Sequence, residues 1–207
     1  MALTNFSELK SNIADFLNRT DLTSVIPTFI AMAEAQFNRD IRHYKMENRA
    51  TATVATQYVE RPSDWLESIR MHLTGSGTTV VNFISAQAMA DKRAGAEDAT
   101  GTPQYYRHSE LNFEFYPTPD GSYTSELLYY QKITSLSDSS TTNWLLTDHP
   151  DVYLYGSLLH SAPYLAEDDR VQLWSQLYAA AINRINLSSE RASNTGAGMV
   201  MKIHGLG

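Results

Sequence analysis

The sequence contains no cysteine, which excludes structural disulfide bonds and cysteine-ligated zinc sites. It also lacks an apolar run of about 18 residues, the length that a membrane-spanning helix needs. No secretory signal precedes Asn5, so we expect no membrane association. Basic residues are outnumbered, with 16 lysines and arginines against 23 acidic residues and a net charge of −7. This charge argues against a protein that wraps nucleic acid with a basic face, but not against one that surrounds DNA without binding it tightly.

The first 42 residues show helical periodicity. Asn5 and Glu8 form a capping box, and apolar residues then recur at helical spacing as far as Leu17. A break follows at residues 20–21. A second helix, with Pro27 in its first turn, is predicted to run to about residue 42.

Residues 143–187 predict two more helices. The first is expected from about His149 to residue 166, with Asp148 or His149 as its N-cap and Pro150 in its first turn. The second is expected to begin at the acidic residues 167–169, where the helix dipole favours negative charge. The first of the two is apolar on nearly all sides, which is typical of a helix buried on several sides.

One glycine inside this apolar helix predicts a close contact. Gly156 costs about 1 kcal/mol relative to alanine in a helix interior. We therefore expect another helix to approach closely there. We also expect four aromatic residues on apolar helical stripes to share one buried core: Phe16, Phe29, Tyr155 and Trp174.

Between the two helical regions the apolar residues alternate, which predicts strands. The turn signals at residues 62–64 and 75–77 separate some of them, and Ser85 is expected to cap a short helix to about residue 93. The predicted strands are 51–55, 58–60, 69–74, 80–83, 104–107, 111–116 and 123–132.

The predicted fold class is α+β, with a helical bundle formed by the N- and C-terminal helices and an inserted antiparallel β region. Neither helix pair alone covers its apolar stripe, so the two ends of the chain are expected to pack together. The predicted parts are residues 1–49 (N-terminal helices), 50–142 (inserted β region with one short helix), 143–192 (C-terminal helices) and 193–207 (flexible docking tail).

No catalytic or metal-binding motif is recognisable. The Asp148–Asp151 run can be read as a metal cluster, but the chemistry of a helix start explains it better. Ser157 and His160 can be read as a nucleophile and a base, but this serine lies inside a predicted helix and not in a nucleophile elbow. We therefore predict no cofactor, no metal and no enzymatic activity. The six histidines are scattered, at positions 43, 72, 108, 149, 160 and 204.

Twelve tyrosines and three tryptophans favour either a large aromatic core or protein interfaces, and both readings remain open. Residues 6–42, 51–73 and 143–165 resemble, in this order, the N-terminal helices, the following strand pair and the third helix of head-to-tail adaptor proteins of tailed bacteriophages. The resemblance implies a helical bundle with a β insertion. It gives no residue-level site to transfer.

The resemblance also implies a function. It implies a structural virion protein in the neck between capsid and tail, assembled in the host cytoplasm as a ring of twelve copies. Its partners would be the portal protein and a tail nozzle or tail tube protein, with genomic DNA passing through the lumen without sequence-specific binding. An acidic ring suits such a conduit. The alternatives are another virion ring component, such as a tail-completion or nozzle protein, and an uncharacterised α+β enzyme.

The C-terminal tail is the candidate partner-binding segment. Glycines at 196, 198, 205 and 207 make it too flexible to fold alone. It nevertheless carries a short apolar patch with one cation, Met199, Val200, Met201, Lys202 and Ile203. We expect this segment to become ordered on the portal or on an adjacent subunit, either in a groove or as a strand at a sheet edge. The alternative is packing against its own subunit.

Overall fold

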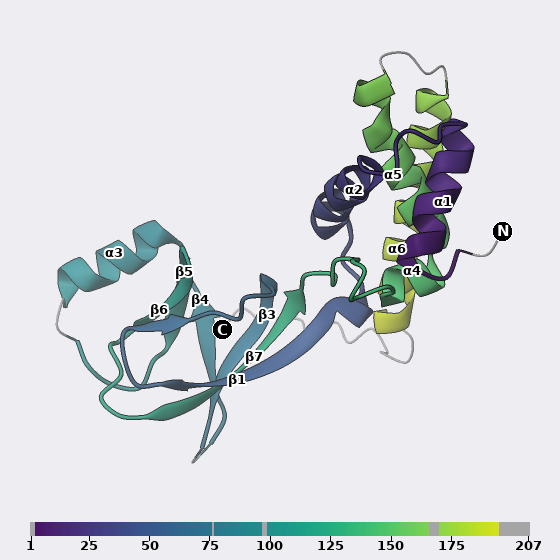
Figure 1. Cartoon of the computed structure of the whole chain (residues 1–207). Coiled ribbons are helices and arrows are strands. Elements are labelled where there is room, and N and C mark those ends of the chain that lie inside the picture. The colour runs from purple at the N-terminus through teal and green to yellow at the C-terminus, as the bar shows by residue number, and fades with distance from the viewer. Residues whose placement is uncertain (1–2, 76, 97–98, 166–169, 195–207) are drawn as a thin grey trace. The chain divides into compact units, whose positions relative to one another are not determined.

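The computed structural model describes residues 3–75, 77–96, 99–165 and 170–194. The chain forms two compact units (Figure 1). The helical unit combines the chain up to Lys45 with the chain from Ile133 onward, and the β unit is the continuous segment Met46–Lys132. The helical unit therefore folds only when the two ends of the chain meet.

Local signals place the starts of the helices in the helical unit. The side chains of Asn5 and Asn143 accept hydrogen bonds from the backbone N–H groups of Glu8 and Leu146, and so cap α1 and α4. Prolines open α2 and α5, where the missing N–H costs nothing. The sequence did not predict α4, which ends just before α5 begins. The helices are α1 (Phe6–Leu17), α2 (Ile26–Asp40), α4 (Trp144–Asp148), α5 (Pro150–Leu165) and α6 (Val171–Asn194).

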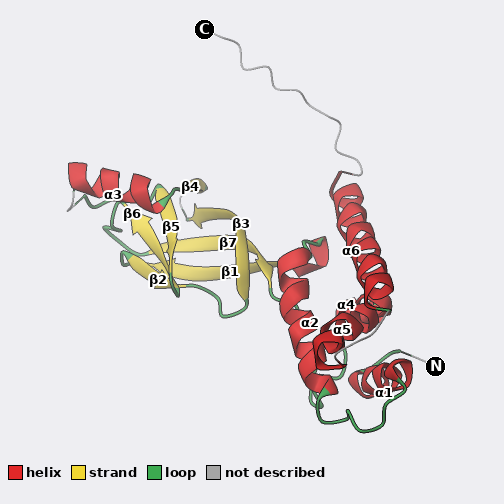
Figure 2. Ribbon diagram, turned by 90° about the horizontal axis from the view of Figure 1, so that it is seen from above, coloured by secondary structure: helices red, strands yellow, loops and turns green. Residues whose placement is uncertain are grey.

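Helix α5 is the centre of this unit. It contacts α1, α2, α4 and α6, which Figure 2 shows gathered around it. These contacts explain why α5 is apolar on nearly all sides. A Cβ atom on Gly156 would lie 2.7 Å from Cε1 of Phe37, a ring on α2. The predicted close approach of another helix at this glycine is confirmed.

The predicted four-residue aromatic core is wrong in part. Trp174 and Phe29 are buried, with 3% and 4% of their surfaces exposed. Tyr155 is only half-buried, and Phe16 is 45% exposed. Phe6, Leu9, Ile13 and Leu17 of the predicted apolar stripe are buried, so the inward face of α1 is as predicted and Phe16 alone lies outside it.

A buried carboxylate ties the two ends of the chain together. Glu34 of α2 accepts hydrogen bonds from the backbone N–H of Leu136 at 2.7 Å and from the Tyr153 hydroxyl at 3.0 Å. The amide of Asn143 donates in turn to the Tyr153 hydroxyl at 2.6 Å. Burial raises the pKa of Glu34, and the two donors partly offset this effect. One side chain from the N-terminal half thus accepts hydrogen bonds from two segments of the C-terminal half.

The β unit is a single seven-stranded sheet in the order β1-β7-β3-β4-β5-β6-β2. Strands β4 and β5 pair in parallel, because α3 (Ala86–Gly95) lies between them in the chain, and the other neighbouring pairs are antiparallel. The strands are β1 (Glu47–Val54), β2 (Tyr58–Glu60), β3 (Trp65–Thr74), β4 (Thr79–Phe83), β5 (Tyr105–Ser109), β6 (Asn112–Tyr116) and β7 (Tyr123–Gln131).

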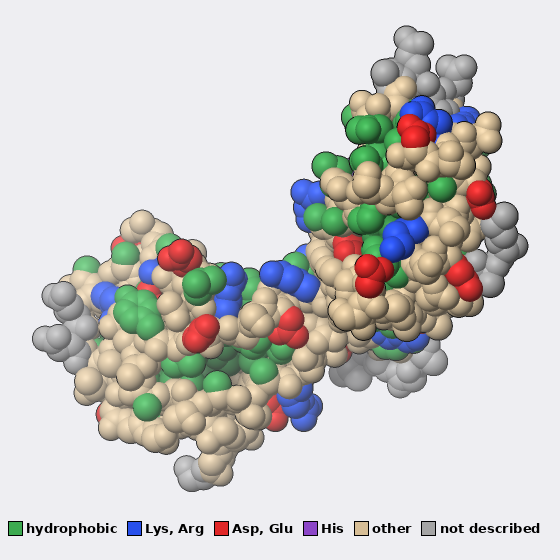
Figure 3. Space-filling view, viewed as in Figure 1, with side chains coloured by type: hydrophobic (Ala, Val, Ile, Leu, Met, Phe, Trp, Pro, Cys, Tyr) green, Lys and Arg blue, Asp and Glu red, His purple; other side chains and the backbone are tan. Residues whose placement is uncertain are grey.

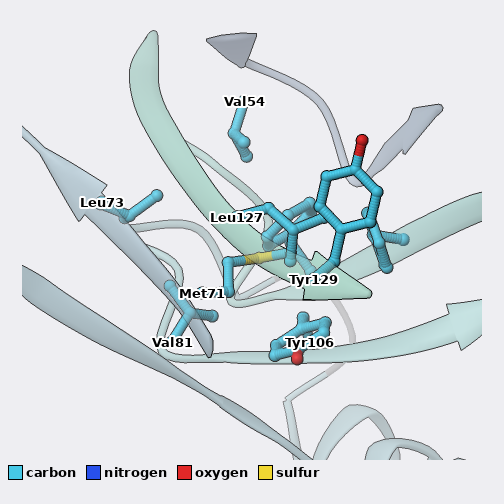
Figure 4. Close-up of a cluster of buried hydrophobic side chains, with 9 residues drawn as sticks. Val54, Met71, Leu73, Val81, Tyr106, Leu127 and Tyr129 are labelled. Carbon is cyan, nitrogen blue, oxygen red and sulfur yellow. The ribbon is translucent and has the colours of Figure 1, made fainter. Parts of the chain in front are cut away.

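The predicted fold class, a helical bundle with an inserted antiparallel β region, is wrong. The sheet is mixed, and it curls into a nearly closed barrel accompanied by six helices in the described parts of the chain. The barrel has its own hydrophobic core, so it is a structural unit in its own right and not a small insertion. Figure 4 shows this core, which is formed by Val54, Met71, Leu73, Val81, Tyr106, Phe113, Phe115, Leu127 and Tyr129.

Glu114 of β6 fastens α3 and the start of β2 to the sheet. Its carboxylate accepts hydrogen bonds from Arg93 of α3 at 2.8 Å, from Gln57 just before β2 at 3.0 Å, and from Arg107 of β5. Burial alone would raise the pKa of Glu114. The hydrogen bonds from Gln57, Arg93 and Arg107 outweigh this effect, and the pKa lies below its ordinary value.

The contact at Gly156 generates a stability prediction. In Gly156→Ala the new methyl group must displace the Phe37 ring, which is fully buried and packs on Tyr153 and Tyr178. Overpacking of this kind costs about 1–3 kcal/mol, more than the gain in helix propensity of about 1 kcal/mol. We expect a lower melting temperature by circular dichroism at 222 nm. Gly95→Ala in α3 is the control, because a Cβ there meets only open space; equal melting of the two variants would contradict the packing argument.

The lowered pKa of Glu114 generates a pH prediction. A carboxyl whose folded-state pKa is depressed stabilises the fold above its unfolded pKa, about 4.3, and loses that contribution as the pH falls through the folded-state pKa. Glu114→Gln leaves two arginines without their carboxylate and should cost on the order of 3 kcal/mol at pH 7. The deficit should shrink below about pH 4. Glu110→Gln, at an exposed turn, should melt like wild type at every pH; a deficit for Glu114→Gln that is independent of pH would refute the assignment.

Candidate interaction surfaces

The residues considered for catalysis do not form a catalytic site. Nε2 of His160 lies 2.9 Å from Oε1 of Gln36, and burial lowers the pKa of this histidine. The Ser157 hydroxyl is buried without a hydrogen-bond partner in the described structure. Asp148, at the end of α4, forms an ion pair with Lys45. These side chains hold helices together in the helical unit.

The described residues contain no group of three or more His, Cys, Asp or Glu side chains placed to hold a metal ion. Within the same residues, every helix falls short of the length and apolarity that crossing a membrane requires. The predicted tail site, Met199–Ile203, lies outside the described residues. Two exposed apolar surfaces within the described residues are the candidate sites that remain.

The first candidate surface is an apolar stripe on α6. The buried side of this helix carries Trp174 and Tyr178, which pack in the helical unit. Its opposite side exposes leucines, with Leu173 54% and Leu187 50% exposed. We define the outer stripe of α6 as Leu173, Leu177, Ala180 and Leu187, which recur at intervals of three, four or seven residues and are all exposed. Such spacing places them on one face of the helix, as in a helix that packs on a second partner.

The second candidate surface is a groove where the barrel fails to close. Strands β1 and β2 are the two ends of the sheet, and each has a neighbouring strand on one side only. A cavity of about 270 Å³ lies between them; we call it the seam groove. Its floor is apolar, as the band of hydrophobic side chains between charged rims in Figure 3 shows. It is lined by Ala50, Thr51, Ala52, Val59, Glu60, Arg61, Pro62, Met71, Phe113, Phe115, Ser125 and Leu127.

Small residues on β1 leave this groove open. Along β1 the side chains of Ala50, Ala52 and Val54 lie on the inward face: Ala50 packs against the barrel core and Val54 is fully buried. Bulky residues normally occupy such positions in a small barrel. Alanine at 50 and 52 leaves space above Met71 and Leu127, which line the groove although little of their surface is exposed.

Sequence reasoning missed both surfaces, although each leaves a signal in the sequence. Leu173 and Leu177 directly precede the buried aromatic residues Trp174 and Tyr178, and Leu187 follows further along the helix. The helix therefore has two apolar faces, where a surface helix has one. Alanines at 50 and 52 stand where a strand prefers β-branched residues. The groove itself was not predictable, since it depends on which strands end the sheet.

A protein-family model described as SU10 adaptor protein matches residues 4–200 of the chain. A comparison with curated proteins gave no match. The family match extends over the helical and β units and into the tail. It confirms the resemblance to phage adaptors that the sequence suggested.

The match also sets the functional class. Adaptors of this family are structural, typically without enzymatic activity, belong to the virion neck and associate with phage portal and tail proteins. The described residues include exposed apolar surfaces of the kind that contacts with other macromolecules use. The chain belongs to the SU10 adaptor protein family and is a phage structural adaptor.

Proposed function

We propose that the protein forms a ring of twelve copies beneath the portal and joins the capsid to the tail nozzle or tail tube. The exposed outer stripe of α6 is the observation that carries this proposal. A subunit in a closed ring uses two different surfaces, one against each neighbour. An amphipathic helix with a second apolar face is suited to one of them, because the first face is already buried in its own subunit.

The ring interface is not on α5. That helix is apolar on nearly all sides and, from sequence alone, is the natural candidate for a contact between subunits. Its neighbours in the helical unit already cover Val152, Leu154 and Leu158. Exposed leucines that share one helical face occur on α6, so we assign the ring interface to that helix.

The ring would serve as a passage for DNA. With 23 acidic and 16 basic residues, the subunit carries a net charge of −7. Negative walls repel phosphates, so DNA passes through without the salt-dependent affinity that clusters of lysine and arginine create. We infer that genomic DNA runs through the lumen without sequence-specific contacts.

The tail would provide a docking arm. Residues 194–207 contain few groups able to form a core of their own, and residues 199–203 carry the apolar patch described above. We infer that these residues bind outside their own subunit, on the portal or on an adjacent adaptor. Twelve weak arms acting together bind far more strongly than one, because each contact raises the effective concentration of the next.

A cryo-EM reconstruction of the purified protein mixed with its portal tests the architecture directly. The proposal requires a twelve-fold ring on the tail-facing side of the portal. A ring of another stoichiometry that binds only tail proteins would instead indicate a tail-completion or nozzle component.

Leu177→Glu tests the α6 interface. A charge in the centre of the outer stripe would have to be buried between subunits without a partner, so we expect the ring to dissociate into smaller species by native mass spectrometry in the presence of portal. Leu177 is 36% exposed, so part of its side chain also packs within the subunit. The melting temperature is therefore measured alongside, to separate loss of the ring from loss of subunit stability.

Ala179→Glu is the matched control. Ala179 is exposed on the same helix but lies outside the stripe, so the variant adds the same charge and should assemble normally. Normal ring formation by Leu177→Glu, or equal disruption by both variants, would place the interface elsewhere.

Deletion of residues 194–207 tests the docking arm. We expect a folded protein with an unchanged thermal transition, because the buried core residues of the described parts of the chain all precede this segment. Binding to the portal, measured by co-sedimentation, should weaken. Unchanged portal binding, or loss of the folded state, would count against an arm that acts outside its own subunit.

A further inference from the structure

The seam groove has the features of a barrel that lacks one strand. Its two rims are sheet edges, β1 on one side and β2 on the other, and its floor is formed by core residues of the barrel such as Met71 and Leu127. Edge strands present unpaired backbone groups that pair readily with an added strand. Proteins usually protect such edges with charge or a covering element. Here the inward positions between the rims are alanines, Ala50 and Ala52, so the space is kept free.

The backbone of β2 directs donors and acceptors into this groove. The N–H of Phe115 donates to the carbonyl of Gln57 at 2.8 Å, and the N–H of Arg61 donates to the carbonyl of Leu111 at 3.0 Å. In an antiparallel ladder, alternate residues point both backbone groups at the same neighbour. The residues between them, Tyr58 and Glu60, therefore point their N–H and C=O groups away from β6 and toward the seam, where the Tyr58 carbonyl already accepts a hydrogen bond from the Thr56 hydroxyl at 2.7 Å.

The C-terminal tail carries the pattern of a strand that fits this site. In an extended chain, Met199, Met201 and Ile203 face one side, and Val200 and Lys202 face the other. Three flexible or branched apolar side chains would then lie over Met71 and Leu127 on the floor. Methionine is adaptable and suits an irregular pocket.

The length of the tail also suits this role. Helix α6 ends at Asn194, and thirteen residues follow it in the chain. The proposed strand begins at Met199, so the extended chain from Asn194 to it reaches only about 17 Å, at roughly 3.3 Å per residue. The receiving groove must therefore lie within that distance of the end of α6. Residues 195–198 include two glycines, which allow the chain to turn after the helix.

Charges at the rim complement the outward face of this strand. Glu60 is exposed on the outer face of β2, and Lys202 is the one cation of the segment 199–203. On a strand beside β2 with its methionines inward, Lys202 lies on the same face as Glu60, where opposite charges stabilise a cross-strand pair. Arg49, on the outer face of β1, already forms an ion pair with Glu126 at 3.2 Å, which reduces its repulsion of a lysine.

We propose that residues 199–203 of one copy bind as an added β-strand in the seam groove of the neighbouring copy. The proposal rests on the ring proposed above and assigns the docking arm its receptor. A tail and a groove at different places on one subunit are a head-to-tail pair, the kind of contact that propagates from copy to copy until a ring closes. The strand supplies main-chain hydrogen bonds on both sides, and the inward side chains supply specificity.

Cysteine cross-linking tests this pairing, because the full-length chain has no cysteine of its own. The single variants Ala52→Cys and Met201→Cys are purified separately, mixed and oxidised. A disulfide requires Cα atoms about 4.4–6.8 Å apart, so only docking in trans gives the joined product. We expect a covalent heterodimer on a non-reducing gel, with the bond between positions 52 and 201 identified by mass spectrometry.

Two controls separate a docked strand from random collision. Thr53→Cys places the thiol on the outer face of β1, and Lys202→Cys places it on the outer face of the proposed strand. The mixtures Thr53→Cys with Met201→Cys and Ala52→Cys with Lys202→Cys should cross-link several-fold less. Equal yields from all mixtures would overturn the proposal.

Two further outcomes are decisive. If the double variant Ala52→Cys/Met201→Cys forms only an intrachain disulfide and the mixture forms none, the tail binds its own subunit and the proposal is wrong. If the mixture cross-links selectively but native mass spectrometry shows no ring, strand docking stands and the ring proposal fails. If cross-linking is unselective or absent while native mass spectrometry shows an intact ring, strand docking is wrong and the ring proposal stands.

Discussion

The hydrogen bonds of Glu34 hold together a unit whose parts are far apart in the chain. A carboxylate on α2 satisfies the backbone of Leu136 and the hydroxyl of Tyr153, so the chain that leaves the β unit and the central helix α5 are held to the same atom. A buried acceptor without these donors would be costly. The helical unit therefore depends on the β unit returning the chain to the right place.

The close packing of α5 on α2 involves the same residue, Tyr153, that donates to Glu34. Gly156 admits the Phe37 ring, which packs edge-to-face on Tyr153, the residue that donates to Glu34. The hydrogen bond to Glu34 and the contact between the aromatic rings thus both hold α5 against α2. With α5 covered on several sides, the apolar stripe left for other copies is on α6.

The β unit is organised by a different constraint, the incomplete closure of its barrel. Glu114 holds α3 and the start of β2 against the sheet, which fixes one rim of the seam groove. The alanines of β1 form the other rim. A rigid rim on one side and small side chains on the other leave an apolar floor within reach of an extended segment, which suits a protein that works by joining copies and partners.

The sequence by itself determined the positions of most helices and strands, the close contact at Gly156 and the resemblance to phage adaptors, because periodicity, caps and turns are local. The tertiary structure alone decided that the strands form one mixed, nearly closed barrel, because pairing depends on contacts between distant residues such as Phe83 of β4 and Tyr106 of β5. It also decided that Phe16 lies outside the core and that α6 exposes a stripe of leucines beside its buried face. A hydrophobic pattern shows which side of an element is apolar, whereas only the arrangement of its neighbours shows what covers that side.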